Sequence, residues 1–244
     1  MSRSRLSVPW PRIIITEMSA PLIALLHLCD SLFPVGAFAH SDGLESAASA
    51  GLVRGAGDLQ RWLDVCLEEA IGRCDGPAVV IAWSAFHEQE WDSLIALDEE
   101  LTAMRPSSTT RMASRSMGLR LLNTWQTLHP HARLQHALAL VSLRTLGPTL
   151  PVAFAGACAC AGIEQRHAVE GFAYTRLAAT ISSAMRLIAI GQNEAHLLLS
   201  RVLARVPATV DAMMFRKAEP ESFMPALDIA QMTHQYVHSR LFRS

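Results

Sequence analysis

The sequence predicts an all-α protein, a single bundle of about ten helices within its 244 residues. Apolar residues recur at the spacing of an amphipathic helix along most of the chain, whereas no segment alternates polar and apolar residues for long enough to predict a strand. Half of the residues are hydrophobic, which is ample for a sizeable core and excludes a disordered chain. Only 18% are charged, against about 25% in typical domains, so some apolar side chains are expected on the surface.

The clearest helix is expected to begin at Asp58, a residue type that favours the N-cap. Its apolar stripe has helical spacing and consists of Leu59, Trp62, Leu63, Cys66, Leu67 and Ala70. Asp75 and Pro77 are expected to open a second, more central helix, because proline favours the first turn. Further helices are expected over residues 91–104, 108–128, 131–143, 150–162, 167–190 and 192–205, separated by Pro106, Pro130, Gly147, Pro148 and Gly191.

Residues 1–17 are rich in arginine, serine and proline and precede a second methionine, Met18. Their apolar run covers only residues 13–15, shorter than the stretch of about 7–15 residues in a signal peptide. We therefore interpret residues 1–17 as a flexible leader and a candidate for not being translated, and residues 18–244 as the helical domain. The five cysteines are odd in number and scattered, which is typical of reduced thiols in a cytoplasmic protein.

An uncharged stretch, residues 145–163, is nearly as long as a membrane span of about 20 residues. It contains two prolines and three glycines, and its alanines and cysteines are only weakly hydrophobic, so we expect a helix packed closely in a core and no membrane partner. Cys158 and Cys160 lie two residues apart, on nearly opposite sides of such a helix. This spacing favours burial over a metal site.

The net charge of −1 conceals a strong segregation. Residues 58–100 hold eleven acidic residues and two arginines, a net charge of −9, whereas residues 101–163 hold six arginines and no acid. Two interpretations are open: solvated helix faces that partly neutralise each other across the fold, or two oppositely charged docking surfaces. An alternative function is a helical nucleic-acid-binding module that uses the arginine-rich segment 101–163. The absence of a recognised motif and the acidic neighbouring segment argue against that function.

No enzyme site is expected. The single lysine, Lys217, has no glycine near it, which excludes the phosphate-binding loop of a P-loop NTPase. His40, Ser41 and Asp42 are the residue types of a hydrolase triad, but three consecutive residues cannot converge side chain to side chain. Asp42 and Glu45 instead predict a capping box at the start of a short, alanine-rich helix.

His234 and His238 are spaced i, i+4, which places both imidazoles on one face of a helix. Such a pair can contact Ni²⁺, Cu²⁺ or Zn²⁺, but two ligands bind weakly, so we expect no tightly bound metal or cofactor. An all-α metallochaperone that uses this pair is a further alternative. The chain ends in two apolar residues flanked by arginines, a combination enriched in interface hot spots and typical of a docking tail. These residues are Arg240, Leu241, Phe242 and Arg243.

Four blocks of residues together resemble the urease accessory protein F family. The first, residues 25–53, contains a Pro-Val-Gly turn, an aromatic residue and a Ser-x-Gly-Leu-Glu helix start. The other three are Arg115 to Leu122, Met185-Arg186 with Gly191-Gln192, and Ser239 to Ser244. The resemblance covers about residues 20–244. The chain departs from the family pattern at residues 189–190, where a proline is usual, and at Gln235, where a glutamate is common.

The resemblance implies an all-α cytoplasmic protein without catalysis of its own. Members look like dimeric scaffolds that bind accessory protein D (also called H) and the GTP-binding accessory protein G, and that act on apo-urease in nickel insertion. GTP would then be bound by a partner, and whether this chain activates that GTPase or only positions it stays open. Arg186 and Gln192 are candidates to face the GTPase, and residues 240–243 to dock into the D-type partner. A surface near the dimer or GTPase contact is expected from Pro34, Val35, Gly36, His40, Ser41, Gly43 and Glu45.

Overall fold

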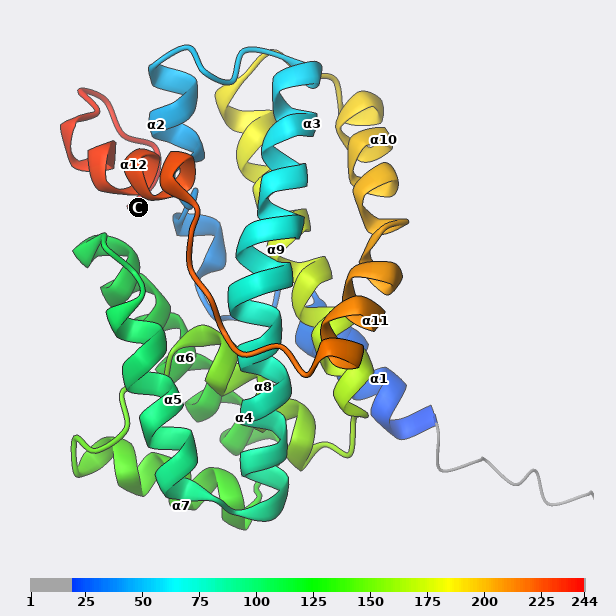
Figure 1. Cartoon of the computed structure of the whole chain (residues 1–244), viewed down its shortest axis with the longest axis vertical. Helices are drawn as coiled ribbons and strands as arrows, with labels where there is room; N and C mark the ends of the chain where they lie inside the picture. Colours follow the sequence, from blue (N-terminus) through cyan, green and yellow to red (C-terminus); the bar gives the residue numbers. More distant parts are fainter. Residues whose placement is uncertain (1–18, 244) are drawn as a thin grey trace, which may run out of the picture.

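The computed structural model describes residues 19–243, which form helices joined by short loops (Figure 1). No strand occurs within those residues, so the all-α prediction is confirmed. The leader predicted at residues 1–17 lies outside them. The helices are α1 (Ser19–Cys29), α2 (Leu44–Ser49), α3 (Ala56–Val65), α4 (Gly76–Glu88), α5 (Trp91–Ala103), α6 (Ser108–Leu128), α7 (Ala132–Ser142), α8 (Leu150–Cys160), α9 (Gln165–Leu187), α10 (Gln192–Leu203), α11 (Val206–Arg216) and α12 (Pro225–Thr233). Two 3₁₀ turns, η1 (Ala37–Ala39) and η3 (His234–Tyr236), and a π-helix, η2 (Cys66–Asp75), complete the chain.

The central element is α8, which the sequence predicts as a closely packed core helix. Residues 150–159 are all buried, and α8 packs against α4, α6 and α9. Glycines permit this close approach: a Cβ on Gly156 would overlap the ring of Phe86, and a Cβ on Gly118 of α6 would overlap the carbonyl oxygen of Pro148. None of the helices between residues 19 and 243 is long and apolar enough to cross a bilayer.

A long rod runs from α3 through η2 into α4 (Figure 1). The apolar stripe predicted for its first half is confirmed by three side chains with no exposed surface, Leu59, Leu63 and Leu67. The helix start predicted at Asp75 and Pro77 is confirmed in position, because α4 begins at Gly76 with Asp75 at its N-cap and Pro77 in its first turn. The chain does not break there, however, since the Gly76 N–H donates to the Ile71 carbonyl, five residues earlier. This is the hydrogen-bond pattern of a π-helix. Pro77 has no N–H to donate, but the π-helical turn before it lets the rod continue into α4 without a break.

The start of the rod also differs from the prediction. The helix begins at Ala56 with Gly55 at the N-cap, so Asp58 lies inside the first turn. There its carboxylate accepts a hydrogen bond from the Arg54 N–H at 2.9 Å and pairs with Arg61 at 2.5 Å. A carboxylate in the first turn is favoured by the helix dipole. Apolar periodicity does not single out α1, α11 or α12, which are short and carry a proline near their start.

Segments from the two ends of the sequence meet at one side of the molecule. α12 packs against α2 and α6, and α9 contacts α1, α2 and η1. In Figure 1, α2 and α12 lie beside each other at the upper left, next to the C-terminus. The fold therefore brings the loop before α2 close to the end of the described chain, where the Arg243 N–H donates to the Ala39 carbonyl.

Candidate partner-binding site

The loop between α1 and α2, residues 34–43 (the PVG loop), is shaped by two glycines. Gly36 and Gly43 have φ angles of 82° and 87°, a region that residues with side chains rarely adopt. Gly43 also lies against α12, where a Cβ would stand 3.0 Å from the Gln231 nitrogen and 3.1 Å from the Ala230 Cβ. The absence of a side chain at Gly43 thus allows α12 to pack onto the loop.

Glu45, the second residue of α2, holds the end of the chain. Its side chain is 4% exposed. The carboxylate accepts hydrogen bonds from the N–H groups of Leu241 at 2.5 Å and Phe242 at 3.2 Å, and it lies 2.7 Å from Nε2 of His234. A buried carboxylate is stable only when such donors replace water. One glutamate therefore joins three residues that lie almost two hundred positions away.

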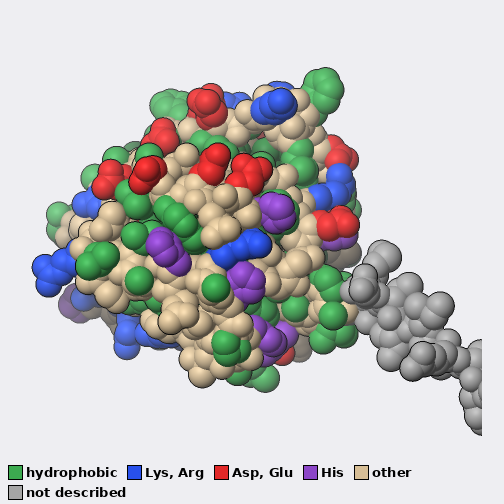
Figure 2. Space-filling view, turned by 90° about the horizontal axis from the view of Figure 1, so that it is seen from below, with side chains coloured by type: hydrophobic (Ala, Val, Ile, Leu, Met, Phe, Trp, Pro, Cys, Tyr) green, Lys and Arg blue, Asp and Glu red, His purple; other side chains and the backbone are tan. Residues whose placement is uncertain are grey.

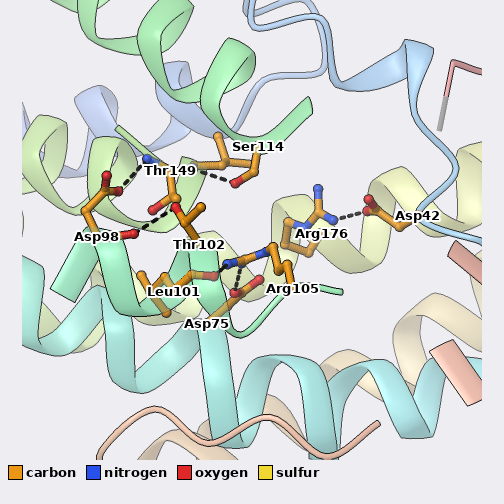
Figure 3. A network of polar contacts seen from close by, with 10 residues as sticks. Asp42, Asp75, Asp98, Leu101, Thr102, Arg105, Ser114, Thr149 and Arg176 are labelled. Carbon is orange, nitrogen blue, oxygen red and sulfur yellow. Dashed lines mark hydrogen bonds and ion pairs between the residues drawn. The ribbon is translucent and has the colours of Figure 1, made fainter. Parts of the chain in front are cut away.

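The capping box predicted from Asp42 and Glu45 is wrong. The N-cap of α2 is Gly43, and no side chain caps this helix. The Asp42 carboxylate instead pairs with the guanidinium of Arg176 in α9 (Figure 3). Burial lowers the pKa of Arg176 to about 10, and Asp42 supplies the opposite charge that this guanidinium needs. The buried Ser41 hydroxyl accepts a hydrogen bond from the Glu45 N–H at 3.4 Å.

The C-terminal tail, residues 237–243, packs onto its own chain. Phe242 is 5% exposed, and Cζ of Arg186 lies 4.4 Å from the centroid of its ring, which is a cation–π contact. The Arg243 N–H donates to the Ala39 carbonyl of the PVG loop at 2.7 Å. Leu241, in contrast, is 58% exposed. Of the two apolar residues expected to dock into a partner, Leu241 is thus available at the surface, whereas Phe242 anchors the tail internally.

The remaining predicted site residues differ in exposure. Pro34 is exposed, and Val35, Gly36 and His40 are half-buried. Gln192 is exposed at the first residue of α10, and Arg240 is exposed in the tail. The PVG loop, the end of α9 and the tail, which come from three of the four sequence blocks, are in contact, and Arg120 of the fourth block lies against Gly36. That these residues bind partners stays a prediction.

The surroundings of His40 are positively charged. Burial and, to a smaller extent, the charges of Arg176, Arg243 and Arg120 together lower the pKa of His40 to about 4. The imidazole is consequently neutral near pH 7, among fixed guanidinium charges. Arg120 and Arg176 were not predicted as site residues. The available signal for Arg120 was its place in the block 115–122, whereas nothing local marks Arg176.

Acidic and basic segments also meet inside the fold (Figure 3). Asp75 of η2 pairs with Arg105 at 2.5 Å, with the two side chains 16% and 13% exposed. Asp98 accepts hydrogen bonds from the N–H groups of Gly147 at 3.2 Å and Thr149 at 2.8 Å. Burial raises the pKa of both aspartates. One charge of the acidic segment is thus neutralised by an arginine of the following segment, whereas Asp98 is held by backbone N–H groups. Both contacts are largely buried, unlike the solvated faces of the first interpretation.

The histidine pair does not share a helical face. α12 ends at Thr233, and Val237 is extended, because the chain turns there to reach Glu45. His234 is 1% exposed, whereas His238 is exposed, so the geometry expected for a metal pair is wrong. Among residues 19–243, no group of three or more His, Cys, Asp or Glu side chains could hold a metal ion. Cys158 is fully buried, as its spacing predicts.

A second surface feature is an apolar groove between α1, α9 and α10, with a volume of about 790 Å³. Leu26, Tyr174 and Met185 line it and are 58%, 43% and 37% exposed. Beside it, α1 exposes Leu22 and Ile23 and carries no acid, lysine or arginine. Some of the apolar side chains that the composition places on the surface are therefore found in and beside this groove.

Comparison with known proteins identifies the family. The sequence model of the UreF family matches residues 53–203, from the loop before α3 to the end of α10. This chain belongs to the UreF family. A urease accessory protein UreF from Azoarcus sp. (strain BH72) is 34% identical over 226 residues, which cover 92% of this chain and 96% of the relative. UreF proteins from Methylibium petroleiphilum and Teredinibacter turnerae are 33% and 30% identical, and each alignment covers 93% of this chain and 95% and 100% of the relative. The alignment thus extends beyond the family match at 53–203, over nearly the whole UreF chain.

Proposed function

We propose that this UreF protein supports urease maturation in the cytoplasm as a non-catalytic scaffold for nickel insertion. The observation that carries the proposal is the surface built by the PVG loop, the end of α9 and the C-terminal tail around Glu45. The name of the relatives, urease accessory protein, supplies the process. An ordered tail that exposes Leu241 next to Arg240 has the chemistry of a protein-docking surface.

The partners of the scaffold are accessory protein D (or H), the GTPase accessory protein G and apo-urease. The tail contacts the D-type protein through Leu241 and Arg240, with Phe242 as the internal anchor. The GTPase contacts the PVG loop and the nearby Arg186 and Gln192. Nickel and GTP are bound by the other components, and this chain holds no cofactor tightly. The stacking of Arg186 on Phe242 favours positioning of the GTPase over insertion of an arginine into its active site.

A second copy of the chain is the proposed occupant of the groove between α1, α9 and α10. The exposed apolar side chains of α1 form a ridge beside this groove, which consists of Leu22, Ile23 and Leu26. The ridge and the groove lie on the same face, as a two-fold symmetric interface requires. The absence of charged residues in α1 fits the core of such an interface. We expect Leu26→Glu to convert a dimer to a monomer in light scattering, whereas Leu143→Glu, at an exposed leucine after α7, leaves the mass unchanged.

The alternative nucleic-acid module has less support. Of the six arginines in the acid-free segment, Arg105 pairs with Asp75, Arg111 donates to the carbonyl oxygens of Arg105 and Pro106, and Arg133 donates to the carbonyl of Phe86. These three guanidinium groups use some of their N–H donors within the chain, which leaves fewer donors for phosphate contacts.

Reconstitution tests the proposed function directly. Apo-urease is co-expressed with the other accessory proteins, with and without this chain, and its nickel content and activity are measured. We expect both to fall to background without the chain; normal nickel incorporation in its absence would refute the proposal. For the tail, Leu241→Asp should abolish co-purification with the D-type protein, whereas Leu143→Asp should not. Retained binding of the Leu241→Asp variant would contradict the assignment of the tail.

A further inference from the structure

A cationic groove lies between the PVG loop, the first half of α6 and the end of the tail. Its volume is about 380 Å³. Two guanidinium groups, one imidazole and two hydroxyl groups line it, from Arg120, Arg243, His40, Thr109 and Ser116. No acidic side chain is among its lining residues.

Both arginines lie against the turn at residues 36–39. Gly36 leaves room for the guanidinium of Arg120, which a Cβ at that position would overlap. The Arg243 N–H donates to the Ala39 carbonyl at 2.7 Å, which fixes the residue that carries the second guanidinium. The PVG loop thus contacts both residues that carry the charges of the groove.

The charges of this groove are not compensated within residues 19–243. Arg176 and Arg105 have aspartate partners, but no described acid lies within ion-pair distance of Arg120 or Arg243. The electrostatic consequence is visible at His40, whose pKa falls to about 4 through burial and through the charges of Arg176, Arg243 and Arg120, with His234 adding to the effect. Among the residues that the structure describes, no anion therefore balances these two guanidinium groups.

The shape of the groove suits a small planar anion. Arg120 and Ser116 are exposed at its rim, while Thr109 and His40 are half-buried. Guanidinium groups bind carboxylates through two parallel hydrogen bonds, and hydroxyl groups can donate to the remaining lone pairs. The rim also carries Met112, which is 64% exposed and offers an apolar contact to the stem of an incoming side chain.

We propose that this groove is a carboxylate-binding site, which receives an aspartate or glutamate side chain of a docking protein between Arg120 and Arg243. The identity of that protein as a urease accessory protein rests on the proposed function. The presence of the anion site does not, because it follows from the groove alone. Arg120 is the residue of this site that the sequence did not predict as a partner-binding residue.

The anion site is tested on the isolated chain by NMR. Sodium acetate is added at constant ionic strength against sodium chloride, and the Nε–H signals of the arginines and the C–H signals of His40 are followed. We expect saturable shifts at Arg120 and Arg243 with acetate and a rise in the pKa of His40, because a bound anion opposes the guanidinium charges. Arg120→Gln should abolish these shifts, whereas Arg201→Gln, at an exposed arginine of α10, should not. Acetate shifts no larger than those with chloride would overturn the proposal.

A second titration uses inorganic phosphate at the same ionic strength. Saturation by phosphate and not by acetate would assign the groove to a phosphate-bearing ligand and overturn the carboxylate assignment. Tighter saturation by acetate supports it, because the planar fork of each guanidinium then sets the preference.

A third experiment measures how charge reversal in the groove changes binding of the accessory proteins. We expect Arg120→Glu to weaken their binding by about tenfold or more and to reduce its salt dependence, as loss of an interfacial charge pair does. Arg201→Glu is the matched control and should change affinity by less than about twofold. If the wild-type chain binds acetate but no accessory protein, the proposed function fails while the anion site stands. If the wild-type chain binds the accessory proteins and Arg120→Glu binds them equally well, the docking role of the groove is refuted.

Discussion

Replacement of Glu45 by glutamine tests the central contact of the candidate site. The carboxylate oxygens of Glu45 face the N–H groups of Leu241 and Phe242 and the Nε2 of His234. Glutamine has almost the same shape but keeps one acceptor oxygen and places an NH₂ group where the other oxygen stood. That NH₂ group must face a donor, so at least one hydrogen bond is lost and a buried donor is left without an acceptor.

The size of the effect follows from these contacts. A hydrogen bond to a charged group contributes about 1.5–3 kcal/mol, and a buried donor left without an acceptor costs about 1–3 kcal/mol. We therefore expect Glu45→Gln to weaken docking of the tail by about 3 kcal/mol, which corresponds to about a hundredfold change in the opening equilibrium. Because the tail can open without unfolding of the α8 core, most of this loss should appear as local opening.

Hydrogen exchange measures this opening at single amides. In Glu45→Gln, the protection of the Leu241 and Phe242 amides should fall by about a hundredfold, while amides of α8 keep their protection. Glu99→Gln is the control, since Glu99 is an exposed glutamate of α5, and it should leave tail protection unchanged. Wild-type protection of both tail amides in a folded Glu45→Gln protein would refute the role of this carboxylate. If Glu45→Gln does not fold, Phe242→Ala keeps the carboxylate and should still expose the tail, since burial of the phenylalanine ring contributes about 1.5–3 kcal/mol.

Three further predictions concern the fold. Gly118→Ala should destabilise the protein by about 3 kcal/mol, because its Cβ would overlap the backbone before α8, whereas Gly57→Ala, in open space within α3, should stabilise it by up to about 1 kcal/mol in urea unfolding. Burial raises the pKa of Cys66 to about 12, so its thiol should react slowly with iodoacetamide near pH 8 until urea unfolds the chain; rapid alkylation of the folded protein would contradict this. His40 has a pKa of about 4 in the folded protein, below its ordinary value of 6.5, so the unfolded state binds more protons between these two pH values. The stability that the neutral imidazole contributes above pH 6.5 should therefore decline as the pH falls toward 4. In thermal unfolding, His40→Gln should flatten this decline.

Local pattern was sufficient for the helices whose buried face follows a regular spacing. The stripe at residues 59–67 and the uncharged stretch that became α8 were predicted correctly, because a helix that buries one face, or all faces, must repeat apolar or small residues at helical intervals. The continuity of the rod through Asp75 and Pro77 was not predicted, because the choice between a helix break and a π register depends on which residues pack around that turn. Arg105, which binds Asp75, comes thirty residues later in the sequence.

The all-α class, the lack of a P-loop motif and the blocks that resemble UreF all follow from the amino-acid sequence alone. It also drew attention to most residues of the PVG loop and the tail. The contacts of Glu45 and His234 depend on the fold. A capping box and a metal pair were predicted from local spacing, whereas both side chains bind partners from the opposite end of the chain. The same holds for the charge of the groove, where Arg120 and Arg243 meet around His40. Hydrogen bonds and electrostatic fields act over distances in space, and local sequence patterns do not reveal which distant residues the fold will bring within that reach.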